Sequence, residues 1–115
     1  MAELTLAFIS ITAFLVFLLT GPLPKNRVKG PEARRLVDRG AVLLDVRTPE
    51  EFANGHIDGA VNIPIDDLNA RIAELADKDN PVIVYCRSGS RSAQAAKTLE
   101  KAGFSVRDLG QMAAW

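Results

Sequence analysis

Residues 81–103 read PVIVYCRSGSRSAQAAKTLEKAG, and this stretch decides the fold. Its first part, PVIVY, is a short apolar run rich in β-branched residues, which is typical of a strand buried on both faces of a sheet. Its last part, SAQAAKTLEKAG, places Ala95, Ala96 and Leu99 at helical spacing and ends at Gly103. A buried strand that leads directly into a helix is the unit from which parallel α/β sheets are built.

The same alternation of strands and helices extends outward from this stretch. The expected elements are a helix over 30–40, a strand over 41–46, a short helix from 48, a strand over 60–63, a helix over 65–80, a last strand over 104–109 and a turn over 110–115. In the fifth of these, Leu68, Ile72 and Leu75 have helical spacing, with Asp66 or Asp67 as the N-cap. The sequence therefore predicts an α/β fold, a small central parallel sheet flanked by helices.

The first 24 residues have a different character. Residues 4–24 carry no charge, and residues 4–23 would span about 30 Å as a helix, the thickness of a bilayer core. This pattern predicts a transmembrane anchor over 1–24 and a separate domain over 25–115. The alternative is a hydrophobic helix packed in a soluble core.

The charges around the apolar run predict its orientation. The basic residues that follow within about 20 positions favour a cytoplasmic C-terminal domain on a single-pass protein. They are Lys25, Arg27, Lys29, Arg34, Arg35 and Arg39. A cleaved secretory signal, and hence an exported domain, is the alternative, but no basic residue precedes the run.

Overall charge and cysteine content exclude several classes of protein. The chain has 14 basic and 14 acidic residues, and only Glu3 among the acidic ones precedes residue 25. The domain over 25–115 is thus close to neutral, which argues against nucleic acid as a partner. One cysteine excludes an internal disulfide and a cysteine-only metal cluster.

That cysteine, Cys86, directly follows the strand PVIVY and therefore lies where parallel α/β sheets bind ligands. The next residues form a small loop whose N–H groups can face inward, beside the N-terminus of a helix. These residues are Arg87, Ser88, Gly89, Ser90 and Arg91. Such surroundings favour a thiolate, which is the nucleophilic form of cysteine. The alternative, a cysteine that ends a strand without a chemical role, does not account for the polar and basic neighbours.

Three stretches resemble the rhodanese-type sulfurtransferase domain: VLLDVRTPEEFANGHIDGAVNIP, VIVYCRSGSRSAQAAKTLEKAGF and LGQMAAW. The resemblance covers residues 28–115 and implies a small α/β domain with a central parallel sheet. It also implies that Cys86 shuttles a sulfane sulfur as a persulfide and that residues 87–91 form its anion-binding loop. The spacing Cys-x4-Arg from Cys86 to Arg91 matches the shorter loop of sulfur transfer in this family, whereas cysteine phosphatases use Cys-x5-Arg.

The resemblance touches several further residues. Asp45 and Arg47 match the family's strand-end Asp-x-Arg pattern. They could shape the mouth of the pocket, but an ion-paired brace between the strand end and the loop is the expected role, since buried charges need partners. Glu51 closes a capping box with Thr48 and belongs to the same class. His56, in GHI, is expected to be structural.

At the C-terminal end, Gln111 departs from the Gly-Gly of many relatives, which puts the local turn geometry in question. Trp115 is expected to pack against the sheet.

The sequence thus predicts a sulfurtransferase that moves sulfur from a donor such as thiosulfate, or a protein persulfide, to an acceptor thiol or cyanide. It implies no metal and no organic cofactor, and the lipid bilayer is an expected partner through residues 4–23. Two other hypotheses remain open. One is a non-catalytic, membrane-tethered interaction module. The other is oxyanion chemistry of the phosphatase or arsenate-reductase kind.

Overall fold

A computed structural model describes residues 26–75 and 77–115. The anchor expected over 1–24 lies outside the described residues. Within the described part of the chain, no helix is both long enough and apolar enough to cross a membrane.

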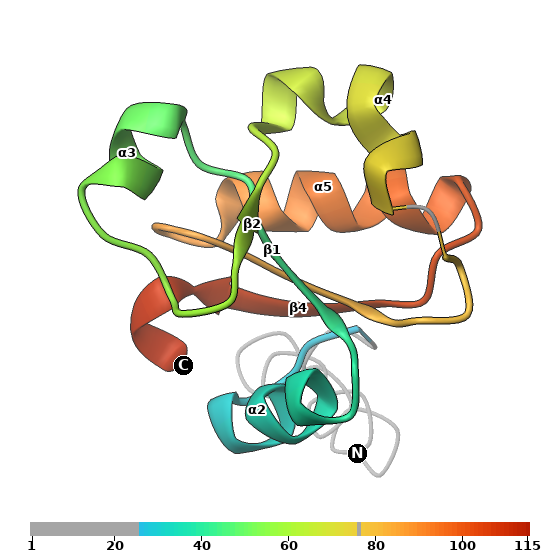
Figure 1. Ribbon diagram of the computed structural model, residues 1–115, viewed down its shortest axis with the longest axis horizontal. Coiled ribbons are helices and arrows are strands. Elements are labelled where there is room, and N and C mark those ends of the chain that lie inside the picture. Colours follow the sequence, from blue (N-terminus) through green and yellow to red (C-terminus); the bar gives the residue numbers. More distant parts are fainter. Residues whose placement is uncertain (1–25, 76) are drawn as a thin grey trace, which may run out of the picture.

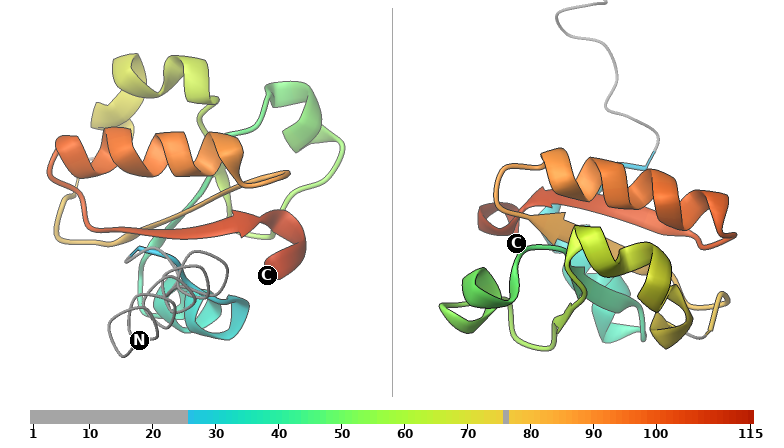
Figure 2. Two further views of the ribbon diagram at one scale, coloured as in Figure 1. Left: turned by 180° about the vertical axis from the view of Figure 1, so that it is seen from behind. Right: turned by 90° about the horizontal axis from the view of Figure 1, so that it is seen from above.

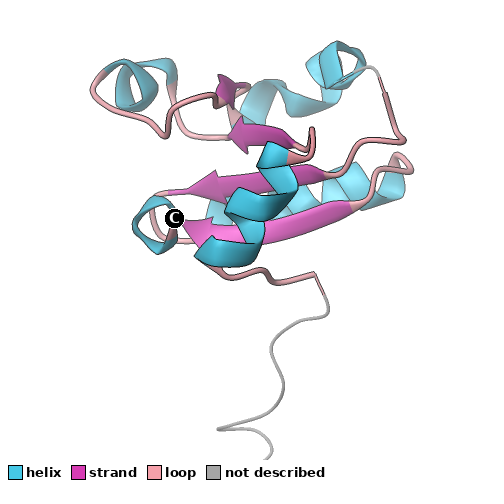
Figure 3. Ribbon diagram, turned by 60° about the horizontal axis from the view of Figure 1, so that its bottom comes forward, coloured by secondary structure: helices cyan, strands magenta, loops and turns pink. Residues whose placement is uncertain are grey.

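The centre of the described domain is a four-stranded sheet in the order β2-β1-β3-β4 (Figure 1). The strands are β1 (Val42–Asp45), β2 (Val61–Asn62), β3 (Val82–Cys86) and β4 (Val106–Gln111). Every pair of neighbouring strands is parallel, so their carboxyl ends share one edge of the sheet. The predicted parallel α/β architecture is confirmed, and Figure 3 shows the strands side by side between the helices.

Helices cover both faces of the sheet, as Figure 2 shows from two further sides. α4 (Leu68–Arg71) and α5 (Ser90–Lys101) lie on one face, and α2 (Gly30–Asp38) lies on the other. α3 (Pro49–Ala53) follows the carboxyl end of β1, and the 3₁₀ turn η3 (Met112–Ala114) follows β4.

The alternation of side chains along β3 divides the core into two clusters. Val82, Val84 and Cys86 belong to the cluster under α5, whereas Ile83 and Tyr85 belong to the cluster under α2. All five side chains are buried, which is why this strand reads as a continuous apolar run. Burying a large apolar side chain contributes roughly 1.5–3 kcal/mol, so β3 is a major source of stability.

The prediction of one continuous helix over 65–80 is wrong. The structure breaks the segment into the 3₁₀ turn η1 (Ile65–Asp67), α4 and a second 3₁₀ turn, η2 (Ile72–Leu75). The Ile65 N–H donates to the carbonyl of Val46, at the end of β1, and this bond fixes the start of the segment on the sheet. Asp67 is the N-cap of α4, but its side chain makes no capping hydrogen bond.

The backbone at the end of β4 shows why Gln111 can stand where many relatives have a second glycine. A β-bulge at Leu109 shifts the register, so that Tyr85 pairs with Gly110 and Cys86 with Gln111. Gly110 has a φ of 81°, and a Cβ there would meet the Arg27 guanidinium at 2.7 Å. Gln111 has a φ of −93° and a ψ of 139°, which any residue adopts, so a second glycine is not needed.

The C-terminal residue packs as expected. Trp115 lies against the cluster under α2, with the guanidinium of Arg34 6.0 Å from its ring centre.

The last strand, β4, begins and ends about two residues later than the sequence predicts, at Val106 and Gln111.

Candidate active site

The thiol of Cys86 lies at the bottom of a loop between β3 and α5. Cys86 is the last residue of β3 rather than the first residue after it, and its side chain has no exposed surface. Its Sγ accepts hydrogen bonds from the N–H groups of Gly89, at 3.0 Å, and Ser92, at 3.4 Å. Gly89 belongs to the loop whose N–H groups are expected to face inward, whereas the Ser92 N–H comes from the first turn of α5. N–H donors at this position favour negative charge on a sulfur.

Local backbone geometry forms this loop. Gly89 is the N-cap of α5 and has a φ of 102°, a conformation that side chains disfavour. A Cβ at Gly89 would lie 3.8 Å from the Gly110 Cα, so the loop rests closely on the bulged end of β4. The N-terminus of α5, a helix of 12 residues, faces the sulfur and adds the positive end of its dipole.

The serines of the loop differ in position and in role. Ser88 and Ser90 are exposed, and neither caps α5 through its side chain. Ser92 is buried within the first turn, where its hydroxyl donates to the Gly89 carbonyl at 3.0 Å. The Ser92 hydroxyl also lies 3.5 Å from the Gly110 carbonyl, so this side chain ties the loop to β4.

The two loop arginines have different partners. Arg91 is bound by both oxygens of Glu51, with Nη1–Oε1 and Nη2–Oε2 distances of 2.6 and 3.1 Å. Glu51 also accepts from the Thr48 N–H, and the predicted capping box is confirmed. Arg87 is exposed and makes no ion pair with any described residue. Glu51 therefore neutralises Arg91 and joins α3 to α5, and Arg87 is the loop cation with an uncompensated charge.

The Glu51–Arg91 pair predicts a pH-dependent stability. Hydrogen bonding from Arg91 is the main cause that lowers the pKa of Glu51 from 4.5 to about 2. A lowered folded-state pKa stabilises the protein fully above the unfolded-state value and loses that effect as the pH falls through the folded-state value. Glu51→Gln is expected to cost about 1 kcal/mol at pH 7, and this difference is expected to shrink between about pH 4.5 and pH 2. Urea unfolding of both proteins at several pH values measures it, and a constant difference down to pH 2 would contradict the pairing.

A second ion pair supports the same edge of the sheet. Asp45 is completely buried, and its carboxylate accepts from the Arg47 backbone N–H, Nε and Nη2 at 2.7–3.0 Å. Arg47 is 5% exposed, donates also to the Gly55 carbonyl and lies 5.8 Å from the Tyr85 ring centre. The bond to Asp45 is the main cause that raises the pKa of Arg47, while burial is the main cause that raises the pKa of Tyr85. The geometry is that of the ion-paired brace expected from the sequence.

His56 makes its contacts with Phe52, in α3. Its ring stacks on Phe52 at 3.7 Å between ring centres, and its Nδ1 is 2.8 Å from the Phe52 carbonyl. The acceptor is a carbonyl, so Nδ1 carries the proton in this bond. His56 therefore fixes the loop after α3, which agrees with the structural role expected from the sequence.

A cavity of about 350 Å³ lies beside the loop, and Arg47 is one of the residues that line it. Its lining residues come from four separate segments, which only the fold brings together. They are Arg47, Glu51, Asn54, Gly55, Arg87, Met112 and Ala113. Within the described residues, no group of three or more His, Cys, Asp or Glu side chains is arranged to hold a metal ion.

Comparison with known proteins relates this site to a family. A family described as "Rhodanese-like domain" matches residues 30–115. The chain is 39% identical to the uncharacterised protein YqhL of Bacillus subtilis, over 85% of this chain and 79% of that one. It is 42% identical to the thiosulfate sulfurtransferase GlpE of Stutzerimonas stutzeri, over 70% of this chain and 72% of that one. A solved structure of a rhodanese with anions from Escherichia coli matches with a TM-score of 0.63 and 36% identity, over 66% of this chain and 92% of that one.

Proposed function

The chain belongs to the rhodanese-like domain family, and from that premise we propose that Cys86 carries a sulfane sulfur as a persulfide between a donor anion and a thiophilic acceptor. Relatives at about 40% identity and the matching rhodanese structure support its assignment as a rhodanese-type sulfurtransferase. The observation that carries the mechanism is the pair of N–H groups, from Gly89 and Ser92, that donate to Sγ.

The proposed reaction has two displacement steps. With thiosulfate as donor, the Cys86 thiolate attacks the outer sulfur, the S–S bond of thiosulfate breaks, and sulfite leaves with the bonding electron pair. An acceptor thiolate or cyanide then attacks the outer sulfur of the persulfide. The bond between that sulfur and Sγ breaks, and the Cys86 thiolate is regenerated. No external oxidant or reductant is consumed.

The loop residues have distinct roles in this scheme. The N–H groups of Gly89 and Ser92 stabilise the charge on Sγ before attack and after release, when the sulfur is anionic. The N-terminus of α5 and the Arg87 guanidinium favour an anionic donor. Arg91 holds the first turn of α5 against Glu51, and its contribution to anion binding is reduced by that pairing.

Intact mass spectrometry of the purified full chain tests this proposal. Incubation with thiosulfate is expected to add one sulfur atom to the protein, and cyanide is expected to remove it. An aryl phosphate offered to the same preparation tests oxyanion chemistry instead. The absence of any sulfur adduct, or hydrolysis of the aryl phosphate, would contradict sulfur transfer.

The proposal also includes a location. Residues 4–23 anchor the protein in a bilayer, and the catalytic domain lies on the cytoplasmic side, as the basic residues after the apolar run favour. A reporter that is active only outside the cytoplasm, fused after Trp115, is expected to give no signal. The full chain is expected to stay with membranes after a high-salt wash. Release by the wash, or a signal from the reporter, would contradict this topology.

A further inference from the structure

The cavity beside the Cys86 loop has a composition that points to a second ligand. It lies between the end of β1, the residues after α3, the first loop residue and η3. Its volume of about 350 Å³ is within the range of small-molecule sites. Its lining includes Arg87, which follows Cys86, and Met112, which follows the β4 partner of Cys86. A molecule in the cavity is therefore next to the mouth of the loop.

The cavity is distinct from the group of atoms that holds the sulfur. The donors to Sγ, from Gly89 and Ser92, do not line it, and Arg87 is the loop residue that it shares. An anionic donor that enters the loop and a second molecule in the cavity would therefore share Arg87 and otherwise contact different residues. The donor and the acceptor act in turn, and the acceptor must reach a sulfur that the loop already holds.

The charges of the cavity determine what it attracts. The charge of Arg47 is balanced by Asp45, and that of Glu51 is balanced by Arg91. Arg87 is exposed and has no ion pair within residues 26–75 and 77–115. Among the described residues that line the cavity, the net charge offered to a ligand is therefore one positive charge, on the residue that follows Cys86.

The other residues that line the cavity favour a ligand with a short apolar stem. Met112 is half-buried and presents a flexible, polarisable thioether, and Ala113 adds a methyl group beside it. Asn54 contributes a side-chain amide. We propose that this cavity is the acceptor subsite, and that it takes a small thiol carrying a carboxylate, with the carboxylate on Arg87 and the stem against Met112.

The inference rests on the proposed function and adds the acceptor class to it. The acceptor thiolate attacks the outer sulfur of the Cys86 persulfide and forms a new S–S bond. The bond from that sulfur to Sγ breaks, and its electron pair stays on Cys86. The product is an acceptor persulfide, and the carboxylate takes no part beyond binding.

Single-turnover kinetics with three small thiols tests the subsite. The full chain is loaded with excess thiosulfate, freed of donor, and mixed with 3-mercaptopropionate, 2-mercaptoethanol or cysteamine. These thiols are similar in size and differ in charge. Mass spectrometry follows the loss of the persulfide, so that only loaded molecules are counted. The measured quantity is the rate ratio of the carboxylated thiol to the neutral one, in wild type and variants, because intrinsic thiol reactivity cancels between proteins.

Arg87→Gln is expected to lower this ratio about 5-fold, the effect of one charge about 4 Å away in water. Met112→Glu leaves the loop intact, places a carboxylate in the cavity, and is expected to lower the ratio further and to favour cysteamine. The two variants test the cavity independently. If one of them takes up little sulfur from thiosulfate, the rate ratio can still be measured in the other.

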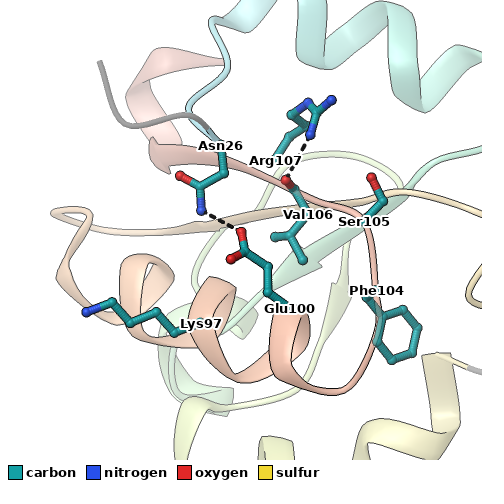
Figure 4. Close-up of a pocket in the computed structure, with 7 residues that line it drawn as sticks. All are labelled: Asn26, Lys97, Glu100, Phe104, Ser105, Val106 and Arg107. Atoms are coloured by element: carbon teal, nitrogen blue, oxygen red, sulfur yellow. Dashed lines mark hydrogen bonds between the residues drawn. The ribbon is translucent and has the colours of Figure 1, made fainter. Parts of the chain in front are cut away.

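Lys97→Gln is the matched control. Lys97 is an exposed cation that lines a different groove, between α5 and β4, together with Asn26, Glu100 and Phe104 (Figure 4). Removing its charge is expected to leave the ratio unchanged.

Two kinds of result separate the proposals. A wild-type protein that forms no persulfide would overturn the proposed function. Normal loading with the same ratio in wild type, Arg87→Gln and Met112→Glu would overturn the acceptor subsite alone, as would an equal drop in Lys97→Gln.

Discussion

Replacing Cys86 with serine is expected to reduce sulfur transfer from thiosulfate by roughly 1,000-fold or more, because the nucleophile that forms the covalent intermediate is lost. The cysteine is the only one in the chain, so no other thiol can replace it. Thiocyanate production from thiosulfate and cyanide measures the rate, and intact mass shows whether any sulfur is bound.

The fold of this variant is expected to persist. A serine hydroxyl is close in size to the thiol and can accept the same N–H groups from Gly89 and Ser92. Circular dichroism and the thermal midpoint provide the control. Full turnover in a folded Cys86→Ser protein would contradict a persulfide on this residue. If turnover is lost together with the fold, Cys86→Ala is the alternative variant, and the same loss of turnover is expected from it.

Replacing Asp45 with asparagine is expected to destabilise the domain by about 3–5 kcal/mol, because the buried Arg47 guanidinium loses its counter-charge. A domain of this size has about 5–15 kcal/mol of stability in total, so the variant would lose a large part of it. Urea unfolding monitored by circular dichroism measures the change. Glu74→Gln breaks the exposed pair with Arg71 and is expected to change the stability far less, because solvent screens a surface ion pair.

A double variant separates the charge from other effects of the Asp45 substitution. Asp45→Asn combined with Arg47→Met removes both charges and keeps an apolar stem under the Tyr85 ring. It is expected to be more stable than Asp45→Asn alone, because no unpaired charge remains buried. Arg47→Met alone provides the reference. If the double variant is less stable than Asp45→Asn by the same amount as Arg47→Met is less stable than wild type, the two residues do not act as a pair.

Local patterns in the sequence are sufficient to predict most of the fold. The buried strand before Cys86, the helix after it and the capping box of Thr48 and Glu51 each depend on neighbouring residues, and the structure confirms them. The position of Cys86 at the carboxyl end of a parallel strand follows from the topology, which the alternation of elements predicts.

The differences arise where distant contacts determine the outcome. The segment over 65–80 has helical spacing, but the hydrogen bond from Ile65 to the end of β1 and the burial of Leu68 and Leu75 divide it into short turns. The pairing of Glu51 with Arg91 joins residues 40 positions apart, and no local pattern reveals it. Part of the lining of the cavity beside the loop was not predicted, because Asn54, Met112 and Ala113 carry no motif of their own.

The parallel order of the strands has a consequence for folding. Parallel neighbours are joined only by long crossovers, so the contacts between Asp45, Tyr85 and Gly110 close large chain loops, at an entropic cost that local contacts do not carry. A domain with such non-local contacts is expected to fold more slowly than a helical bundle of equal length. The cavity draws on residues from 47 to 113, and the Asp45 carboxylate that holds Arg47 lies in β1, so a fragment that lacks β1, β3 or β4 loses either this ion pair or part of the site. A complete site is therefore expected only when the whole domain is folded.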